Sequence, residues 1–433
     1  MHFLYNLLAV IIVIMAIPVF IVRLVRENGF GERLRQSFGF IPERVLAPVA
    51  GRQCIWLHAA SVGEIVAASP IAKEIRRQFP RDPILVSVVT ASGYAMAKSI
   101  ISDADSVIFF PVDLPWLSHR VVSRIRPKVF LPVETELWPN FLKAARHFRI
   151  PVMMVNGRIS DKSVKRYHYL HSVLNDMMDT VVKFCMQSMI DAQYVIRLGA
   201  DPHRVVVTGN TKYDQTYTAV SQTEKQDLRR QLGLEAVGPV VVAGSTHKGE
   251  EEMLFTAFQQ IRTQFSQARM IIAPRETMRS DEIIALAENY GFHGARRTRL
   301  QRKPAAGHDF VLLDTIGELG KIYSIGDIIY VGGSLVPHGG HNILEPAAHG
   351  KPIFVGPHMF NFKDTYALFS GRGACLTVCD TDELAEKMLQ ILNNEDERQA
   401  MSSKTLAIIE ENRGAARKSV YYLKILLEEE SIR

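Results

Sequence analysis

The chain begins with a long apolar stretch and then changes to an alternation of short apolar runs and amphipathic segments. Residues 7–22 are continuously apolar, and no Lys, Arg, Asp or Glu occurs before residue 23. A helix of about 20 apolar residues crosses the hydrocarbon core of a bilayer. Positive charge follows the run, at Arg23 and Arg26, which disfavours a cleaved signal peptide. Residues 1–22 therefore predict a transmembrane anchor, rather than a buried core helix, with the rest of the chain in the cytoplasm.

Residues 23–50 form a separate segment after the predicted anchor. Within it, residues 28–40 mix Arg with Phe at intervals that suit a helix lying at a membrane interface. A solvated linker with incidental aromatic residues fits the same composition. The segment is therefore assigned only as an interfacial linker.

From residue 54 onward, short runs rich in β-branched residues alternate with helical stretches. Such alternation predicts right-handed βαβ units and a parallel sheet. The polar residues 210–225 lack apolar periodicity, and the alternation restarts after them. We therefore predict an α/β fold with two doubly wound, Rossmann-like domains facing a cleft, over residues 51–215 and 216–433, the second including terminal helices. The predicted strands are 54–59, 84–89, 107–110, 128–133, 152–155, 181–186 and 205–208 in the first domain, and 239–243, 270–273, 310–314, 327–331, 352–355 and 374–378 in the second.

Composition narrows the function classes only slightly. The 433 residues are 47% hydrophobic and 22% charged, which excludes a disordered, collagen-like or multi-span membrane protein. Lys and Arg number 51 against 45 Asp and Glu, and the net charge of +6 favours a negatively charged partner without choosing between nucleotide, anionic lipid and nucleic acid. The four cysteines are widely spread and indicate a reducing compartment rather than a disulfide framework.

Two motifs place carboxylates where a parallel sheet binds ligands, at the carboxyl ends of strands. Ser61 and Glu64 follow the first strand with the spacing of a capping box, which is a structural alternative to a general base at Glu64. As a base, Glu64 would be kept ionised by the helix N-terminus and would be only weakly basic. Glu134 and Glu136 follow the strand at 128–133 and suit either acid–base chemistry or a helix N-terminus.

Two further motifs in the second domain are candidates for binding a nucleotide. Gly244, Ser245 and Thr246 form a possible phosphate loop, although neither the Walker nor the G-x-G-x-x-G spacing is present. In the glycine-rich residues 332–346, Asn342 and Glu345 share one face of a first helical turn, where the glutamate can accept two ribose hydroxyls. A metal site of His338, His341 and Glu345 is a weaker alternative, because no H-E-x-x-H motif exists.

Taken together, the motifs resemble those of the 3-deoxy-D-manno-octulosonic acid (Kdo) transferases. The resemblance covers nearly the whole chain, including the N-terminal anchor. Its most specific parts are ETELWPN and GGHNxLEP. The segments that carry it are HAASVGE (58–64), ETELWPN (134–140), GNTKYD (209–214), GST (244–246), APR (273–275) and VGGSLVPHGGHNILEP (331–346).

The resemblance implies the GT-B fold and an inverting, metal-independent transfer of Kdo from CMP-Kdo to the lipid A precursor in lipopolysaccharide biosynthesis. It implies a single-pass protein of the inner membrane with its catalytic domains on the cytoplasmic face. CMP-Kdo is then a co-substrate and there is no cofactor; the partners are the lipid A precursor and inner-membrane lipids, and no nucleic acid. Carried over by position, the base is Glu64, the charge-stabilising pair is Glu134 and Lys212, and the CMP contacts are Pro274, Arg275, Ile316, Gly317, Glu318, Asn342, Ile343, Leu344 and Glu345.

One departure and two rival functions remain. The family often has His after the Pro-Arg pair, whereas this chain has Glu276, which puts a contact from that position in doubt. A nucleotide-sugar 2-epimerase has the same fold but needs no membrane anchor. A non-catalytic, membrane-tethered nucleotide-binding module is the third reading.

Overall fold

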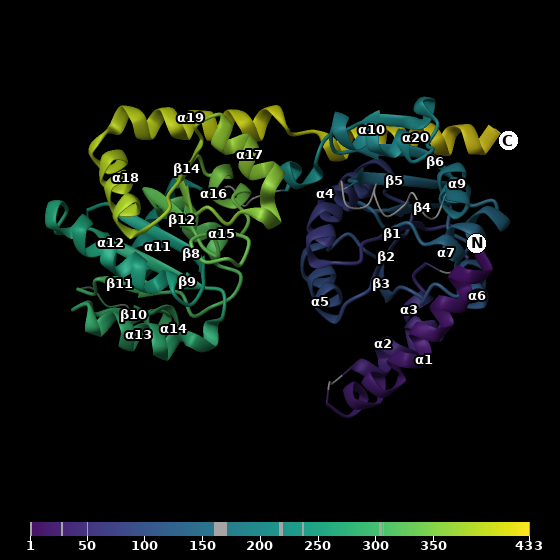
Figure 1. Ribbon diagram of the computed structural model, residues 1–433, viewed down its shortest axis with the longest axis horizontal. Coiled ribbons are helices and arrows are strands. Elements are labelled where there is room, and N and C mark those ends of the chain that lie inside the picture. The colour runs from purple at the N-terminus through teal and green to yellow at the C-terminus, as the bar shows by residue number, and fades with distance from the viewer. Residues whose placement is uncertain are drawn as a thin grey trace. The chain divides into compact units, whose positions relative to one another are not determined.

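The chain divides into two compact units in a computed structural model. Unit 1 comprises Met1–Gln215 and Asn412–Arg433, and unit 2 comprises Thr216–Glu411 (Figure 1). The predicted boundary at residues 215 and 216 adjoins residues 216–219, which lie outside the described residues. The structure describes residues 2–26, 29–49, 51–159, 171–215, 220–235, 238–302, 305 and 307–432.

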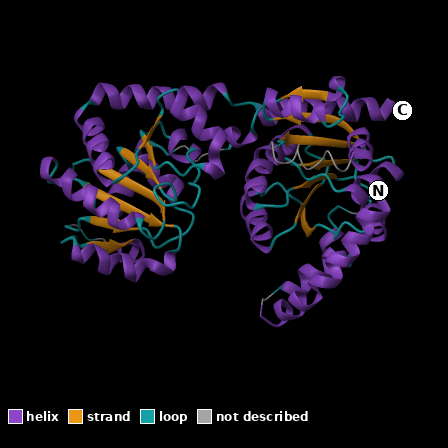
Figure 2. Ribbon diagram, viewed as in Figure 1, coloured by secondary structure: helices purple, strands orange, loops and turns teal. Residues whose placement is uncertain are grey.

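Unit 1 is built on a sheet of parallel strands with helices packed around it (Figure 2). The sheet has seven strands in the order β3-β2-β1-β4-β5-β6-β7. Its inner strands are buried along their whole length, because helices pack on both faces and two separate apolar clusters fill the two interfaces. All seven predicted strands of the first domain are confirmed. They are β1 (Ile55–His58), β2 (Ile84–Val88), β3 (Ser106–Phe109), β4 (Val129–Pro132), β5 (Val152–Gly157), β6 (Val181–Met186) and β7 (Val205–Val207).

Polar side chains cap the N-termini of several helices of unit 1. At the start of α4, for example, the Ser61 hydroxyl accepts the amide of Glu64, and at the start of α5 the Thr90 hydroxyl accepts the amide of Gly93. The helices after β1 are α4 (Val62–Gln78), α5 (Ala91–Ile100), α6 (Pro115–Ile125), α7 (Pro139–His147), α9 (His171–Thr180), α10 (Met189–Arg197), η2 (Pro202–Arg204), η3 (Thr211–Asp214) and α20 (Ala415–Ile432).

The last helix differs from the sequence-based assignment. We placed the terminal helices in the second domain, but α20 packs on α4 and η3 of unit 1. Val420 and Leu423 join the apolar cluster beneath α4, and the Asp214 carboxylate accepts the amides of Gly414 and Ala416 at 2.5 and 2.6 Å. These partners lie some 200 positions apart in sequence, so local pattern could not reveal the return of the chain.

Unit 2 repeats the architecture with a second seven-stranded parallel sheet, in the order β10-β11-β9-β8-β12-β13-β14. Six of its strands match predicted ones, which confirms the fold class of two parallel α/β domains. β10 escaped prediction because its sequence, Gly-Ala-Arg, has no β-branched or aromatic residue. The strands are β8 (Val240–Thr246), β9 (Arg269–Pro274), β10 (Gly294–Arg296), β11 (Phe310–Leu312), β12 (Ile328–Val331), β13 (Ile353–Val355) and β14 (Cys375–Thr377).

Helices cover both faces of the second sheet as well, and the cluster beneath α12 and α18 holds large side chains such as Phe255, Phe258 and Phe310. The helices are α11 (Gln222–Gln231), α12 (Glu250–Gln264), η4 (Thr277–Arg279), α13 (Ser280–Asn289), α14 (Arg297–Arg302), α15 (Leu319–Ile322), η5 (Tyr323–Ile325), α16 (Leu344–Ala348), η6 (Phe360–Phe362), α17 (Lys363–Gly371), α18 (Thr381–Asn393) and α19 (Glu395–Glu411).

Three helices precede the first sheet: α1 (His2–Arg26), α2 (Phe30–Ser37) and α3 (Glu43–Leu46). Within α1, Tyr5–Val22 has a mean hydropathy of 2.7 and none of it is buried, so by length and composition the helix could cross a membrane. The absence of burial argues against the alternative of a core helix. The start of α1 also contacts the α/β part of unit 1, because the Tyr5 hydroxyl donates to Asp113 Oδ2 at 2.9 Å.

Candidate active site

In each sheet the strand order reverses beside the first strand of the unit, between β1 and β4 in unit 1 and between β8 and β12 in unit 2. Ligands of open parallel sheets bind at the carboxyl ends of the strands at such a point. Glu64 and Glu134 follow β1 and β4, and the Gly244 and Gly332 segments follow β8 and β12. Glu64, Glu134 and the Gly244 and Gly332 segments thus lie at the switch point of their own unit.

Glu64 lies in the first turn of α4 and is held by its own helix start. The Ser61 hydroxyl donates to Glu64 Oε1 at 2.7 Å, and it accepts the Glu64 amide at 3.3 Å. The amide of Ala60 donates to Glu64 Oε2 at 2.7 Å. The N-cap half of the capping box therefore exists, but the Glu64 carboxylate accepts the amide of Ala60 instead of that of Ser61, and these bonds fix its direction.

The protonation of Glu64 differs from our expectation of a weakly basic carboxylate. Burial raises the pKa of Glu64 to about 7, and the negative charge of Glu136, then that of Glu134, acts in the same direction. The hydrogen bonds from Ser61 and Ala60 oppose this rise but do not overcome it. A carboxylate with a pKa near 7 is matched to general-base chemistry at neutral pH.

Glu134 and Lys212, the charge-stabilising pair that the resemblance implies, form an ion pair. Lys212 Nζ lies 3.0 Å from Glu134 Oε1, and both side chains are half-buried. The backbone of Glu134 has a φ of 59°, in the left-handed region that costs a residue with a Cβ roughly 1–2 kcal/mol. Such strain persists where the surrounding structure fixes a functional side chain, which fits a carboxylate aimed at a reacting group.

Behind these residues lies a polar chain whose role sequence reasoning missed. His58, at the end of β1, is fully buried; its Nδ1 is 2.9 Å from Ser87 Oγ, which also accepts the Trp56 indole N–H at 2.7 Å. His58 Nδ1 also lies 3.2 Å from the Ser87 carbonyl oxygen, which can only accept, so Nδ1 carries a proton that it donates to this carbonyl or to the second lone pair of Ser87 Oγ. His58 Nε2 has no hydrogen-bond partner and faces Glu136 Oε2 at 3.5 Å.

In unit 2, a fully buried carboxylate joins the two loops at the switch point. Glu250 Oε1 accepts the Tyr330 hydroxyl at 2.6 Å and the amides of Ser334 and Leu335 at 3.0 and 3.1 Å. Glu250 Oε2 accepts the amides of Gly333 at 2.7 Å and His247 at 2.9 Å. The signal was present in the sequence as a glutamate three residues after His247, but its other partners lie 80 to 85 positions away.

Residues 244–246, the possible phosphate loop, make contacts within the protein. The Thr246 hydroxyl donates to Glu251 at 2.9 Å, so this hydroxyl is engaged within the protein. A Cβ at Gly244 would lie 2.0 Å from the Tyr323 hydroxyl, so packing against Tyr323 already requires this glycine. The backbone of Ser245, with a φ of 57°, lies in the left-handed region that side chains rarely adopt. Internal contacts thus account for Gly244 and engage the Thr246 hydroxyl, and a phosphate-binding role of this loop stays a prediction.

The remaining predicted donor contacts surround the same edge of the second sheet. Pro274 ends β9 and is buried, and the Arg275 amide donates to Thr246 O at 2.9 Å while its side chain is exposed. Ile316 is 90% exposed, and Gly317 has a φ of 91°. Burial works to raise the pKa of Glu318, but hydrogen bonds from Arg297 and then Thr315 outweigh it and lower that pKa.

Asn342 and Glu345 lie together, as their spacing predicts. Asn342 Nδ2 is 3.3 Å from Glu345 Oε1, and Asn342 Oδ1 accepts the Leu344 amide at 3.0 Å. Burial raises the pKa of Glu345, against the hydrogen bond from Asn342 and the charge of Arg275. Ile343 and Leu344 are buried, so only their backbone is available to a ligand. Within the described residues, no group of three or more His, Cys, Asp or Glu side chains is arranged to hold a metal ion.

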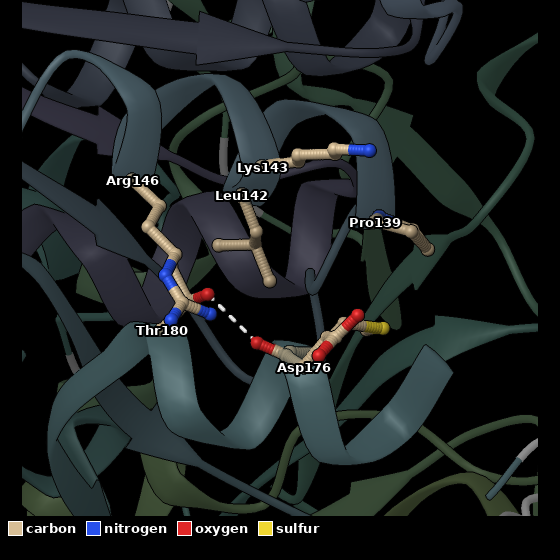
Figure 3. Close-up of a pocket in the computed structure, with 7 residues that line it drawn as sticks. Pro139, Leu142, Lys143, Arg146, Asp176 and Thr180 are labelled. Atoms are coloured by element: carbon tan, nitrogen blue, oxygen red, sulfur yellow. Dashed lines mark hydrogen bonds between the residues drawn. The ribbon is translucent and has the colours of Figure 1, made fainter. Parts of the chain in front are cut away.

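A separate pocket lies on unit 1 between α7 and α9 (Figure 3). Its lining includes the basic residues Lys143 and Arg146 beside Asp176, and the Thr180 hydroxyl donates to Asp176 O at 2.7 Å. No residue predicted for the site lines this pocket.

Comparison with known proteins gives the following matches. A family model described as 3-deoxy-D-manno-octulosonic-acid transferase (kdotransferase) matches residues 32–215, and one described as glycosyl transferases group 1 matches residues 239–406. The 3-deoxy-D-manno-octulosonic acid transferase of Haemophilus influenzae is 31% identical over 93% of each chain, and that of Bordetella pertussis is 32% identical over 88% of this chain and 89% of the relative. A crystal structure of UDP-GlcNAc 2-epimerase from Neisseria meningitidis matches with a TM-score of 0.59 and 13% identity, over 86% of this chain and 99% of that one, which supports the GT-B fold alone.

Proposed function

The chain belongs to the Kdo transferase family and is a glycosyltransferase, and from this premise we propose that it transfers Kdo from CMP-Kdo to the lipid A precursor. The observation that carries the proposal is the Glu64 carboxylate, fixed by Ser61 and Ala60 at the switch point of the first sheet with a pKa of about 7. In this role Glu64 removes the proton from the acceptor hydroxyl. Attack from the face opposite the leaving CMP inverts the anomeric centre.

The other residues of the site stabilise charge. As CMP leaves, positive charge develops on the sugar and negative charge on the phosphate. The Glu134–Lys212 pair places both signs of charge beside Glu64, and Arg275 supplies a cation at the edge of the second sheet. Glu345 and Asn342 would hold the ribose of CMP, with Pro274, Ile316, Gly317 and the Ile343–Leu344 backbone completing the CMP contacts. Cations already present can do the work of a metal ion, so transfer should survive EDTA.

An apolar pocket of unit 1 supports a lipid acceptor. It is lined by aromatic side chains of α1, α2 and the strand ends, with Arg33 among them. Trp138 lines the pocket and also donates its indole N–H to Glu136 at 2.9 Å, which links the pocket to the carboxylates of the site. Acyl chains suit the aromatic lining, and Arg33 suits an anionic headgroup. The aromatic lining residues are Phe20, Phe30, Phe38, Phe110 and Trp138.

We propose α1 as the attachment to the inner membrane, with both units on the cytoplasmic side. A single span, as the sequence predicts, would put Tyr5 and Asn6 across the bilayer from unit 1. Two contacts favour a helix lying in the interface instead: Tyr5 donates to Asp113, and Asn6 Oδ1 accepts Asn140 Nδ2 at 2.9 Å. A Leu7→Cys protein labelled by a membrane-impermeant thiol reagent from the outer side of the inner membrane would establish the span. Protection of that cysteine would establish the interfacial arrangement.

The test of the function is mass spectrometry of the product made by purified protein from CMP-Kdo and a tetra-acylated lipid A precursor. We expect the lipid to gain the mass of at least one Kdo residue, with and without EDTA. Release of free sugar from a nucleotide sugar without the acceptor would favour an epimerase. Binding of CMP without turnover of CMP-Kdo would leave only a nucleotide-binding module.

A further inference from the structure

Three histidines gather at the carboxyl ends of β8 and β12 in unit 2. His247 follows β8, and His338 and His341 belong to the glycine-rich segment after β12. His247 Nε2 and His341 Nε2 are 2.8 Å apart, and the ring of His338 stacks on that of His247 with centroids 4.2 Å apart. His247 is held in place from behind, because its amide donates to the buried Glu250 carboxylate.

The contact between His247 and His341 fixes how many protons the pair can hold. Two ring nitrogens at this distance need one proton between them, so one ring donates from Nε2 and the other accepts with its own proton on Nδ1. The same hydrogen bond persists if one further proton turns the donor ring into an imidazolium. With one more proton, both Nε2 atoms would carry hydrogen, and neither could accept the hydrogen bond. The pair can therefore change its charge from zero to +1, and no further, without breaking.

The groups that face the pair keep it neutral in the ligand-free protein. Burial, followed by the charges of His247, Arg275 and His338, lowers the pKa of His341 to about 4. Burial and then His338 lower the pKa of His247, with Arg275 acting in the same direction and Glu250 and Glu276 opposing it. An anion placed among these groups would reverse the balance, since it favours the charged form of the pair.

We propose that His247 and His341 recognise an oxyanion of the donor and that the pair takes up one proton from solvent as the donor binds. The inference rests on the proposed function, because CMP-Kdo carries two such groups, the phosphate of CMP and the carboxylate of Kdo. The imidazolium provides a positive charge and N–H donors, both of which an oxyanion requires. The proton returns to solvent when the product CMP leaves.

Calorimetric titration of the full-length protein in detergent tests the proposal. The ligands are cytidine, CMP, and Kdo added to protein saturated with CMP, each measured at pH 6.5, 7 and 8 in two non-phosphate buffers of different ionisation enthalpy. Heat that depends on the buffer reports the number of protons taken up. Uptake with CMP identifies the phosphate as the anion, and uptake only on adding Kdo identifies the carboxylate. We expect none with cytidine and an affinity for the anionic ligand that rises as the pH falls, by up to tenfold per unit for one proton.

Variants separate the histidine pair from the ligand, because the phosphate of CMP itself titrates near pH 6. His341→Gln and His247→Gln should abolish the uptake that belongs to the pair and lower the affinity at pH 6.5 by roughly tenfold. The exposed His293→Gln, also in unit 2, is the matched control and should behave as wild type. Proton uptake and pH dependence unchanged in both folded pair variants would overturn the inference. A folded wild-type protein that binds neither CMP nor Kdo would instead overturn the proposed function.

Discussion

Glu64 and Glu250 stand at corresponding places in the two units, at the start of the helix that follows the first strand of each sheet. Glu64 accepts hydrogen bonds from Ser61 and Ala60, both within its own helix start, and it remains partly exposed. Glu250 is fully buried and accepts four amides and one phenol, most of them from the segment after β12. The same topological position thus carries two carboxylates in different surroundings.

This difference teaches that the number of hydrogen-bond donors, and the segments they come from, decide whether such a carboxylate exchanges a proton or holds loops together. The bonds to Glu64 leave its pKa at about 7, so it can exchange a proton in the neutral range. Every oxygen of Glu250 is engaged, and its bonds hold the His247 loop against the glycine-rich segment. We infer that Glu64 serves the chemistry and that Glu250 positions the loops of the donor site.

Replacing Glu64 should give the largest effect on activity. An amide cannot accept the proton of the acceptor hydroxyl, so Glu64→Gln should lower transfer by at least about a hundredfold, as removal of a general base does. CMP affinity should be unchanged, because Glu64 belongs to the other unit. Radiolabelled Kdo transfer and CMP calorimetry give the two readouts. Glu74→Gln, on the same helix α4, is the control and should retain activity. Near-wild-type transfer by Glu64→Gln would return this residue to a capping role.

Replacing Glu250 should damage the fold of unit 2 rather than a chemical step. Glu250→Ala leaves buried amides and the Tyr330 hydroxyl without an acceptor, at about 1–3 kcal/mol for each unsatisfied group. We expect the free energy of unfolding to fall by about 3–5 kcal/mol. Hydrogen exchange should show loss of protection at the amides of Gly333 and Ser334.

The matched control for Glu250 is Glu224→Gln in the exposed capping box of α11, which should cost about 1 kcal/mol or less. Unchanged exchange at the Gly333 and Ser334 amides in Glu250→Ala would show that the carboxylate does not hold the segment.

The sequence predicts a role for Glu64 but not for Glu250, and the reason is physical. The partners of Glu64 are three and four residues away, so spacing alone exposes the cap. The partners of Glu250 on the glycine-rich segment are 83 to 85 positions away, and they meet it only because β8 and β12 pair as neighbours. The strands were predictable from local composition except β10, whereas the return of α20 to unit 1 and the pKa of Glu64 depend on contacts between distant segments.

Glu345 offers a smaller effect confined to the donor site. If its carboxylate accepts the ribose hydroxyls of CMP, Glu345→Ala should lose a charged hydrogen bond of about 1.5–3 kcal/mol, or roughly tenfold or more in CMP affinity. Calorimetry with CMP measures this directly. Glu288→Gln, at an exposed position of α13 in unit 2, is the matched control and should bind CMP as the wild type does. Equal CMP affinity in folded Glu345→Ala and wild type would remove Glu345 from the site.

Glu136 should give the smallest effect, a shift in the pH profile. Glu64 must be ionised to act as a base, so kcat/KM should fall as the pH drops below about 7. After burial, the charge of Glu136 is the largest cause of the raised pKa, and Glu136→Gln should therefore move the acid limb of the profile to lower pH.

The contribution of Glu64 to the stability of the fold should change with pH in the opposite direction to its activity as a base. Because the folded pKa of Glu64 lies above its ordinary value of 4.5, its protonated form stabilises the fold below pH 4.5, and this contribution is lost as the pH rises through about 7. Glu64→Gln should remove that dependence from the melting temperature measured between pH 5 and 8. An acid limb that stays in place in Glu136→Gln would mean that the charge of Glu136 does not contribute to the raised pKa of Glu64. The difference in role between Glu64 and Glu250 would then rest on burial and on the number of hydrogen bonds that each carboxylate accepts.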